Sequence, residues 1–595
     1  MVLRPEPTPG KKAVTKGSFA FVLHSHLPYV LWHGRWPHGT DWLCEAAAET
    51  YLPIIKILRE LQAEGKNPKL TIGLSPVLCE QLSDQTFKTE FVSYLNLKLK
   101  SARDDIEEFL GLQQHSLLNI ARFWENWYSS TLENFDSLNQ NIVDEFKRLQ
   151  SDRLVEIISC GATHGYYPLL SKDESLQVQT KAAVKNYEKH FGRKPKGIWL
   201  PECAYRPAYD WTPPLPINGK QESRRRKGAD EFLSENGIEF FIVDSALLKG
   251  GEAIGAYLDR FESLQKLFDQ YQKSVASRPE EKDKTPYEVY LVASDTRKKP
   301  VAVFSRNPET GLLVWLGKHG YPGESDYLEF HKKRWPSGHK YWAVTSSKSE
   351  LDQKSEYNRE AALGCIAENA SDFVAKVKEL LGEYQSKSGK PGIIVSPYDT
   401  ELFGHWWFEG PMFLKHVLSE IEESSEIENV FLSDYLEKTK PGRLISLPEG
   451  SWGEGNHHFI WLNRENEWTW KLVYESEEKM VELARYWTEN SDKRDNELKD
   501  ILLQLGRELM LMSASDWQFL ISTKAAGDYA EQRLKEHYED FIKLAALADK
   551  KIAGESLTVD DREFFNDCQK RDNLFPELEL EWFAGVQFPA KVGVT

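Results

Sequence analysis

The sequence predicts an α/β fold built on parallel strands, either a barrel or a doubly wound sheet. Short apolar runs rich in β-branched residues recur along the chain, at residues 18–23, 70–74, 154–159, 196–200, 238–243, 301–304 and 392–395. Long helical patterns separate these runs, and strands that are joined through helices pair in parallel. Unusual polar residues also follow several of the runs directly, which is typical of the active-site edge of such folds.

Helical patterns between and after the strands predict the domain organisation. Residues 91–150 form one long amphipathic stretch, which we interpret as an insertion. From about residue 437 helical patterns dominate, at residues 477–487, 495–512, 525–548 and 559–567. We therefore predict a tail at residues 1–17, a parallel α/β core at residues 18–436 with insertions at about 77–150 and 205–300, and an all-α C-terminal domain at residues 437–595.

Two further long segments without a strand pattern interrupt the predicted core. Residues 211–228 (WTPPLPINGKQESRRRKG) are rich in proline and then basic. We predict an exposed loop there, with the basic run at 224–227 solvated rather than bound to a polyanion. Residues 250–300 form a second long excursion, with a predicted helix at 261–275.

Composition excludes several classes of protein. The 595-residue chain has 75 basic and 92 acidic residues, a formal net charge of −17, which disfavours a nucleic-acid partner. It has no apolar stretch of about 18 residues and no leader-like N-terminus, so we expect a cytoplasmic protein without a membrane partner. The six cysteines are scattered, which predicts neither a zinc cluster nor a disulfide framework.

Polar side chains follow four of the predicted strands. His24 and His26 follow the first, His164 the third, Glu202 the fourth, and Asp399 the last. The carboxyl ends of parallel strands meet at one face, so these side chains should converge.

The chemistry of this set favours glycosyl transfer, which needs two carboxyl groups. Glu202 and Asp399 supply them, and the histidines would bind sugar hydroxyls or orient a carboxylate. An alternative is a metal site built on His24 and His26 with His164 and Asp399, as in a metal-dependent polysaccharide deacetylase. The chain is also rich in aromatic rings, with 19 Trp and 24 Tyr. Such rings line sugar-binding clefts, but core packing explains them equally well.

Nine segments in order carry a closer resemblance. They are HSHLPYV at 24–30, WPHGTDWLCEA at 36–46, GATHGYYP at 161–168, WLPECAY at 199–205, FSRNPETG at 304–311, GYPG at 320–323, YDTELFGHWWFEG at 398–410, SWGEGNHHFIWLN at 451–463 and SDWQFLIST at 515–523. As an ordered set they closely resemble glycoside hydrolase family 57 and, within it, the 1,4-α-glucan branching enzymes. The similarity runs from Phe19 to about residue 541.

The resemblance implies a fold and a reaction. The fold would be an incomplete (β/α)7 barrel with helical insertions and an all-α C-terminal domain. Glu202 would be the nucleophile and Asp399 the general acid/base of a retaining reaction that cleaves α-1,4 and forms α-1,6 linkages in glycogen- or starch-type metabolism. The substrate would be amylose, amylopectin or glycogen, bound by a monomer or small homo-oligomer without metal or cofactor. The substrate contacts that the resemblance implies are His24, His26, Trp42, His164, Arg306, Trp315, Gly323, His405, Trp452, Trp461 and Asp516.

The chain departs from the family pattern in two places. Related branching enzymes shield the glucosyl-enzyme with a tyrosine on a loop after the fifth strand, and here residues 250–300 enlarge that region. Tyr257, Tyr271, Tyr287 and Tyr290 are the candidates, and hydrolysis should rise if none covers the site. Ala525 stands where some relatives have a polar glucan contact. An α-amylase-like hydrolase, a 4-α-glucanotransferase and a catalytically silent glucan-binding protein remain as alternatives.

Overall fold

The computed structural model of the protein describes residues 15–248, 283–295, 297–316, 320–346, 348–490 and 495–586. The predicted helix at 261–275, together with Tyr257 and Tyr271, lies outside these residues.

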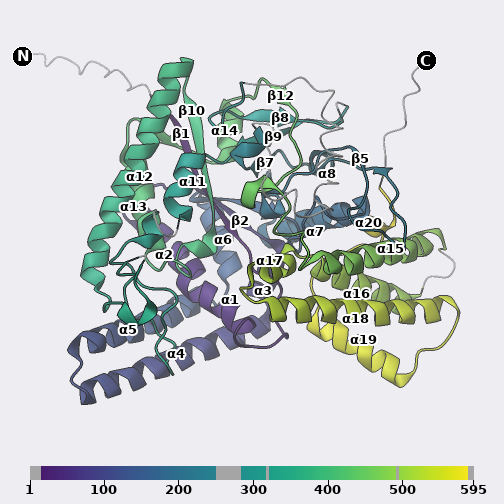
Figure 1. Ribbon diagram of the computed structural model, residues 1–595, viewed down its shortest axis with the longest axis horizontal. Helices are drawn as coiled ribbons and strands as arrows, with labels where there is room; N and C mark the ends of the chain where they lie inside the picture. Colours follow the sequence, from purple (N-terminus) through teal and green to yellow (C-terminus); the bar gives the residue numbers. More distant parts are fainter. Residues whose placement is uncertain are drawn as a thin grey trace, which may run out of the picture.

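Parallel strands form the core of the molecule (Figure 1). In spatial order they run β10-β1-β2-β3-β4-β7-β9, each pairing in parallel with the next. A parallel bridge between Arg306 and Val395, with the Asn307 amide donating to the Val395 carbonyl over 2.9 Å, connects the end of β9 to β10 and closes the ring. The incomplete (β/α)7 barrel is therefore confirmed. Its strands are β1 (Gly17–Ser25), β2 (Leu70–Leu74), β3 (Val155–Cys160), β4 (Gly197–Trp199), β7 (Phe240–Val243), β9 (Val301–Ser305) and β10 (Gly392–Asp399).

Each of these strands coincides with one of the seven predicted runs. The barrel strand β7 lies within the span 205–300, so the insertion predicted there is divided in two. Short strands that the sequence pattern did not predict extend the sheet: β8 (Tyr290–Val292) pairs antiparallel with β9, β12 (Leu444–Ile445) pairs with β8, and β11 (Ile427–Asn429) pairs with β1.

The alternation of side chains along β1 explains why the barrel has two apolar layers. Successive strand residues point to opposite faces. Ala20 and Val22 pack inside the barrel with residues such as Trp199 of β4. Phe19 and Phe21 point outward, where their rings lie 5.9 Å and 6.0 Å from the ring of Phe373 in α12 (Arg359–Ser388). The strand is thus buried on both faces.

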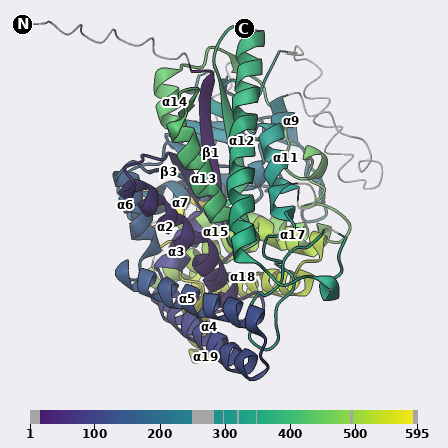
Figure 2. The same cartoon turned by 90° about the vertical axis from the view of Figure 1, so that its left-hand side faces the viewer.

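Helices cover the outside of the barrel, and Figure 2 shows α12 and α13 running alongside β1. The predicted insertion is two long helices, α4 and α5, which pack side by side at the lower left of Figure 1, followed by the shorter α6. The helices of this part are α1 (Thr40–Ala46), α2 (Leu52–Ala63), α3 (Pro76–Ser83), α4 (Gln85–Gly111), α5 (His115–Ser137), α6 (Ile142–Ser151), α7 (Asp173–Phe191), α8 (Ala229–Glu235), α9 (Ser245–Leu248), α11 (Pro308–Trp315), α12, α13 (Gly410–Glu423) and α14 (Leu432–Lys438).

The C-terminal residues form a helical layer beside the barrel, at the lower right of Figure 1. An antiparallel bridge between Gly165, after β3, and Ala514 joins this layer to the barrel, directly before α17. The helices are α15 (Glu467–Glu489), α16 (Asn496–Met512), α17 (Ser515–Thr523), α18 (Gly527–Ile552), α19 (Val559–Arg571) and α20 (Glu581–Ala584).

None of the described helices is both long enough and apolar enough to cross a membrane.

The basic run at 224–227 is not fully solvated, and that prediction is wrong for two of its residues. Arg226 and Lys227 are each 2% exposed. The Arg226 guanidinium lies 4.7 Å from the ring of Trp211, donates to the Pro168 carbonyl and forms an ion pair with Glu449. A buried cation needs such partners. The short hairpin of β5 (Asp210–Trp211) and β6 (Arg224–Arg225) turns these side chains inward, which composition did not reveal.

We predict that Arg226→Met lowers the free energy of unfolding by about 3 kcal/mol, because Glu449 loses its buried cation. The matched control is Arg225→Met, since the Arg225 side chain is 60% exposed. This control should stay within about 0.5 kcal/mol of the parent chain. Urea unfolding of the three proteins side by side measures the difference. Equal stability of the two variants would contradict the structural role of Arg226.

Candidate active site

A cleft of about 1120 Å³ opens at the carboxyl ends of the barrel strands. It brings together nearly all of the side chains that the sequence singled out, although they come from segments far apart in the chain. Its lining includes His24, His26, Trp42, His164, Glu202, Arg306, Trp315, Asp399, His405, Trp452, Trp461 and Asp516. Gly323, in contrast, ends the short turn Tyr321–Gly323 and does not belong to the described lining.

Glu202 is held in a strained backbone conformation directly after β4. Its φ of 61° and ψ of 26° lie in the left-handed region, which is uncommon for a residue with a side chain. The Trp452 amide donates to the Glu202 carbonyl over 3.1 Å and fixes this turn. The strain therefore has a local stabilising contact, and it places the carboxyl group in the cleft.

Two donors point at the Glu202 carboxyl group. The Trp452 indole Nε1–H donates to Oε2 over 2.9 Å, and the Ser515 hydroxyl donates to Oε1 over 2.7 Å. Burial raises the pKa of Glu202, and these two hydrogen bonds act in the opposite direction. The donors favour the ionised form that a nucleophile needs.

Asp399, at the end of β10, has the opposite environment. Burial raises its pKa well above the usual range, and the neighbouring Glu401 and Glu202 carboxylates raise it further. Arg306 lowers it but is itself in an ion pair of 2.5 Å with Asp244. This environment favours the protonated form of Asp399, the form in which a carboxyl group can give up a proton.

Glu401, which the sequence analysis did not single out, is a third carboxyl group in the cleft. It accepts hydrogen bonds from the Tyr51 hydroxyl at 2.5 Å and from the His26 amide at 3.2 Å. Burial raises the pKa of Glu401 to about 7. When it is ionised, the charge of Glu401 raises the pKa of the neighbouring Asp399.

Three histidines stack beside the two carboxyl groups. The rings of His26 and His164 lie 3.9 Å apart at an angle of 11°, and His24 and His164 share a hydrogen bond of 3.0 Å between their Nε2 atoms. His26 Nε2 lies 2.9 Å from Asp516 Oδ2. Burial lowers the pKa of both His24 and His164 well below the usual range, so both imidazoles are neutral.

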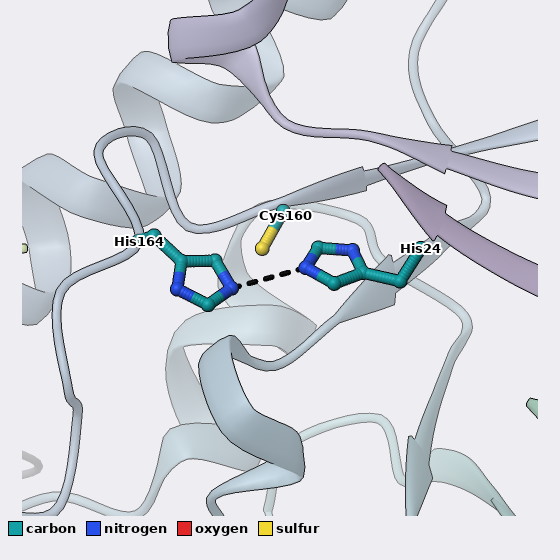
Figure 3. A group of neighbouring side chains, drawn as sticks. All are labelled: His24, Cys160 and His164. Atoms are coloured by element: carbon teal, nitrogen blue, oxygen red, sulfur yellow. Dashed lines mark hydrogen bonds between the residues drawn. The ribbon is translucent and has the colours of Figure 1, made fainter. Parts of the chain in front are cut away.

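Two groups of these side chains could hold a metal ion. The donor atoms of His24, Cys160 and His164 lie within 4.8 Å of one another, as do those of His26, His164 and Asp516. Figure 3 shows the first group, with the His24 and His164 nitrogens facing each other across their hydrogen bond. Neither group contains Asp399, which the metal alternative required, and His24, His26, His164 and Asp516 all make hydrogen bonds to protein atoms.

The aromatic side chains of the cleft differ in their packing. Trp315 and Trp452 meet edge to face at 5.7 Å. Trp461 is only 1% exposed and stacks on Tyr166 at 4.5 Å, so core packing accounts for most of its surface. The cleft also includes Trp36 and Trp335, which are 79% and 88% exposed. Trp36 begins one of the quoted segments but was not named as a substrate contact, and Trp335 lies outside all of those segments.

His405 lies at the far side of the cleft, near the ring of Phe330 at 5.5 Å. Its amide donates to the Thr50 hydroxyl over 3.0 Å. Burial lowers the pKa of His405 to about 4, so it is neutral and can act as a hydrogen-bond partner.

Two of the four candidate shielding tyrosines lie among the described residues, and neither reaches the cleft. Tyr287 stacks on Tyr384 at 4.9 Å, and its carbonyl accepts from Ile393 at the start of β10, the end of that strand remote from Asp399. The Tyr290 hydroxyl accepts from the Thr285 amide over 2.9 Å.

The helical layer contributes directly to the cleft. Ser515 and Asp516 begin α17, and Ala525 lies just beyond its end, where the sequence analysis noted the loss of a polar contact. Ser515 lies inside one of the quoted segments, but its role was missed because a serine at the start of a helix is an ordinary sequence feature.

Comparisons with known proteins agree with this geometry. The profile of glycosyl hydrolase family 57 matches residues 20–448, and that of the C-terminal part of 1,4-alpha-glucan branching enzyme matches residues 472–583. A 1,4-alpha-glucan branching enzyme of Thermococcus kodakarensis is 39% identical over 94% of this chain and 77% of its own length. The crystal structure of a branching enzyme of this type from Pyrococcus horikoshii is similar with a TM-score of 0.84 at 38% identity, over 96% of this chain and 98% of that one. The α-amylase AmyC from Thermotoga maritima gives a TM-score of 0.78 at 27% identity, over 96% and 100%.

We predict that Trp452→Phe moves the acid limb of kcat/KM for α-glucan turnover to higher pH. The variant keeps an aromatic ring but loses the N–H that donates to Glu202, so the pKa of Glu202 rises. Trp315→Phe is the control, because the Trp315 indole nitrogen has no hydrogen-bond partner among the described residues. Its acid limb should stay in place. A common acid limb in both variants would argue against the hydrogen bond.

Proposed function

This chain belongs to glycosyl hydrolase family 57, and on that premise we propose that it is a 1,4-α-glucan branching enzyme that works with retention. The observation that carries the mechanism is the contrast between two buried carboxyl groups in one cleft. Glu202 has two hydrogen-bond donors, whereas Asp399 has further carboxylates as neighbours. Opposite protonation states are what an acid and a nucleophile require.

In the first half of the reaction, ionised Glu202 attacks the anomeric carbon of an α-1,4-linked glucose. A bond forms between a carboxyl oxygen and that carbon as the glycosidic bond breaks. Asp399 gives its proton to the departing glucan oxygen. The product is a covalent glucosyl-enzyme with the remaining chain attached.

In the second half, Asp399 is the base. It removes the proton from the 6-hydroxyl of an acceptor glucan, whose oxygen then displaces Glu202 and forms an α-1,6 linkage. Two inversions at the same carbon restore the α configuration. If water takes the place of the acceptor, the outcome is hydrolysis.

Branching is favoured over hydrolysis by two comparisons. The helical C-terminal residues 472–583 match a profile described for branching enzymes, and two branching relatives are 38% and 39% identical, whereas the α-amylase and the mycobacterial relatives described as probable branching enzymes are 27% identical. We assign the substrate as amylose, amylopectin or glycogen and the setting as glycogen- or starch-type synthesis. All six cysteines are free thiols, which supports a reducing compartment such as the cytoplasm.

Glu202→Gln and Asp399→Asn should each lower kcat by more than about 10³-fold, since one removes the nucleophile and the other the proton donor. Circular dichroism and thermal unfolding should match the parent chain. Asp399→Asn should also lose the basic limb of the pH profile, which reflects loss of the proton from Asp399 as pH rises. Near-normal turnover by either variant would contradict the catalytic role proposed for that residue.

The type of product separates branching from hydrolysis. We predict that incubation with amylose lowers the iodine absorbance while reducing ends increase mainly after treatment with a debranching enzyme. The Glu202→Gln variant is the blank. Reducing ends that rise directly, with no gain on debranching, would identify an α-amylase-like hydrolase instead.

A further inference from the structure

Ser515 links the proposed nucleophile to the buried histidines. Its hydroxyl lies 2.7 Å from Glu202 Oε1 and 2.8 Å from His164 Nδ1. The direct distance from His164 Nδ1 to Glu202 Oε1 is 3.8 Å, too long for a hydrogen bond. The Ser515 amide also donates to the His164 carbonyl over 3.0 Å. Ser515 is fully buried and therefore bridges the two side chains without competition from solvent.

The direction of these hydrogen bonds follows from the number of protons. A serine hydroxyl has one hydrogen. If that hydrogen points to ionised Glu202, the Ser515 oxygen accepts from His164 Nδ1–H. A neutral imidazole carries one N–H, so His164 Nε2 accepts, and His24 Nε2 is its donor across 3.0 Å.

His24, at the far end of this series of hydrogen bonds, supports the same direction independently. With the hydrogen bonds in this direction, His24 carries its hydrogen on Nε2 and a lone pair on Nδ1. His24 Nδ1 is buried and has no hydrogen-bond partner among the described residues. The reverse direction would leave an N–H group buried there without an acceptor, which is the costlier arrangement.

We propose that Ser515 is a positioning residue which, as the last donor of a one-way chain from His24 through His164, keeps Glu202 ionised and oriented for attack. The proposal rests on the role of Glu202 in the proposed function. Both carboxyl oxygens of Glu202 then face hydrogen atoms, from Ser515 on Oε1 and from Trp452 on Oε2. Both donors stabilise the negative charge of the carboxylate, so protonation of Glu202 would weaken both hydrogen bonds.

The other ionisable groups around the His24–His164–Ser515 hydrogen-bond chain do not provide a hydrogen-bond partner for His24 Nδ1. His26 stacks on the face of His164 and is bonded to Asp516 and Ser75. Cys160 lies beside His24 and His164 (Figure 3), where burial raises its pKa well above the usual range and keeps it a thiol. Asp516 and Asp399 face the same cleft, and Asp516 raises the pKa of Glu202. Ser515, the residue before Asp516, acts on the pKa of Glu202 in the opposite direction through its hydrogen bond.

The test compares Ser515→Ala with Ser513→Ala, a nearby buried serine whose hydroxyl donates to the Leu509 carbonyl outside the cleft. Ser515→Ala should lower kcat/KM near neutral pH by about 10- to 150-fold and move its acid limb up by about 1 to 2 pH units, the range for a hydrogen bond to a charged group. Ser513→Ala should leave the acid limb unchanged, and Ser515→Thr should restore it. An unmoved acid limb in folded Ser515→Ala would overturn the proposal.

Neutron diffraction of the parent protein tests the direction without any activity. We expect deuterium on Nε2 of His24 and on Nδ1 of His164, and none on Nδ1 of His24. Deuterium on His24 Nδ1 would overturn the proposal even if the enzyme branches glucans. Conversely, a chain of the expected direction in a protein that leaves amylose unchanged would count against the proposed function alone.

Discussion

The removal of two carboxyl groups from water in one cleft is the constraint on which the rest of the site depends. Burial alone pushes the pKa of Glu202 and of Asp399 in the same direction, toward the neutral acid. Among the described residues, side-chain hydrogen-bond donors reach the carboxyl group of Glu202 but not that of Asp399, and these donors come from a loop after the barrel and from the start of α17. The strained turn at Glu202 and the stacked neutral histidines are organised around that asymmetry.

The fold and the two carboxyl groups could be predicted because their signals are local. Buried parallel strands appear as continuous apolar runs, and polar residues at their ends must meet once the barrel closes. Ser515 could not be found in this way, since its function depends on α17 docking against the loop after β3. The burial of Arg226 was missed for a similar reason: a basic run has the same composition whether it faces solvent or the rings of Tyr209 and Trp211.

The sequence motifs predicted which residues line the cleft better than they predicted which of those residues are exposed in it or influence its chemistry. Trp315 and Trp461 are equally aromatic and both line the cleft, but Trp461 is almost fully buried against Tyr166 whereas Trp315 is only partly buried. Glu401, two residues after Asp399, was quoted only as part of a motif, yet it is the leading charged neighbour behind the high pKa of Asp399. Its effect is electrostatic and depends on the burial of both carboxyl groups in one cleft, which a linear pattern does not record.

The Ser515 amide and hydroxyl both contact His164, and the Trp452 amide and indole both contact Glu202. Each pair of contacts fastens a left-handed residue of the barrel to a segment that follows it in the chain. The barrel therefore does not hold the conformation of these two residues by itself. The backbone at His164 and at Glu202 depends on the first turn of α17 and on the loop that contains Trp452, so removal of the C-terminal segments would leave the barrel strands without the contacts that shape the cleft.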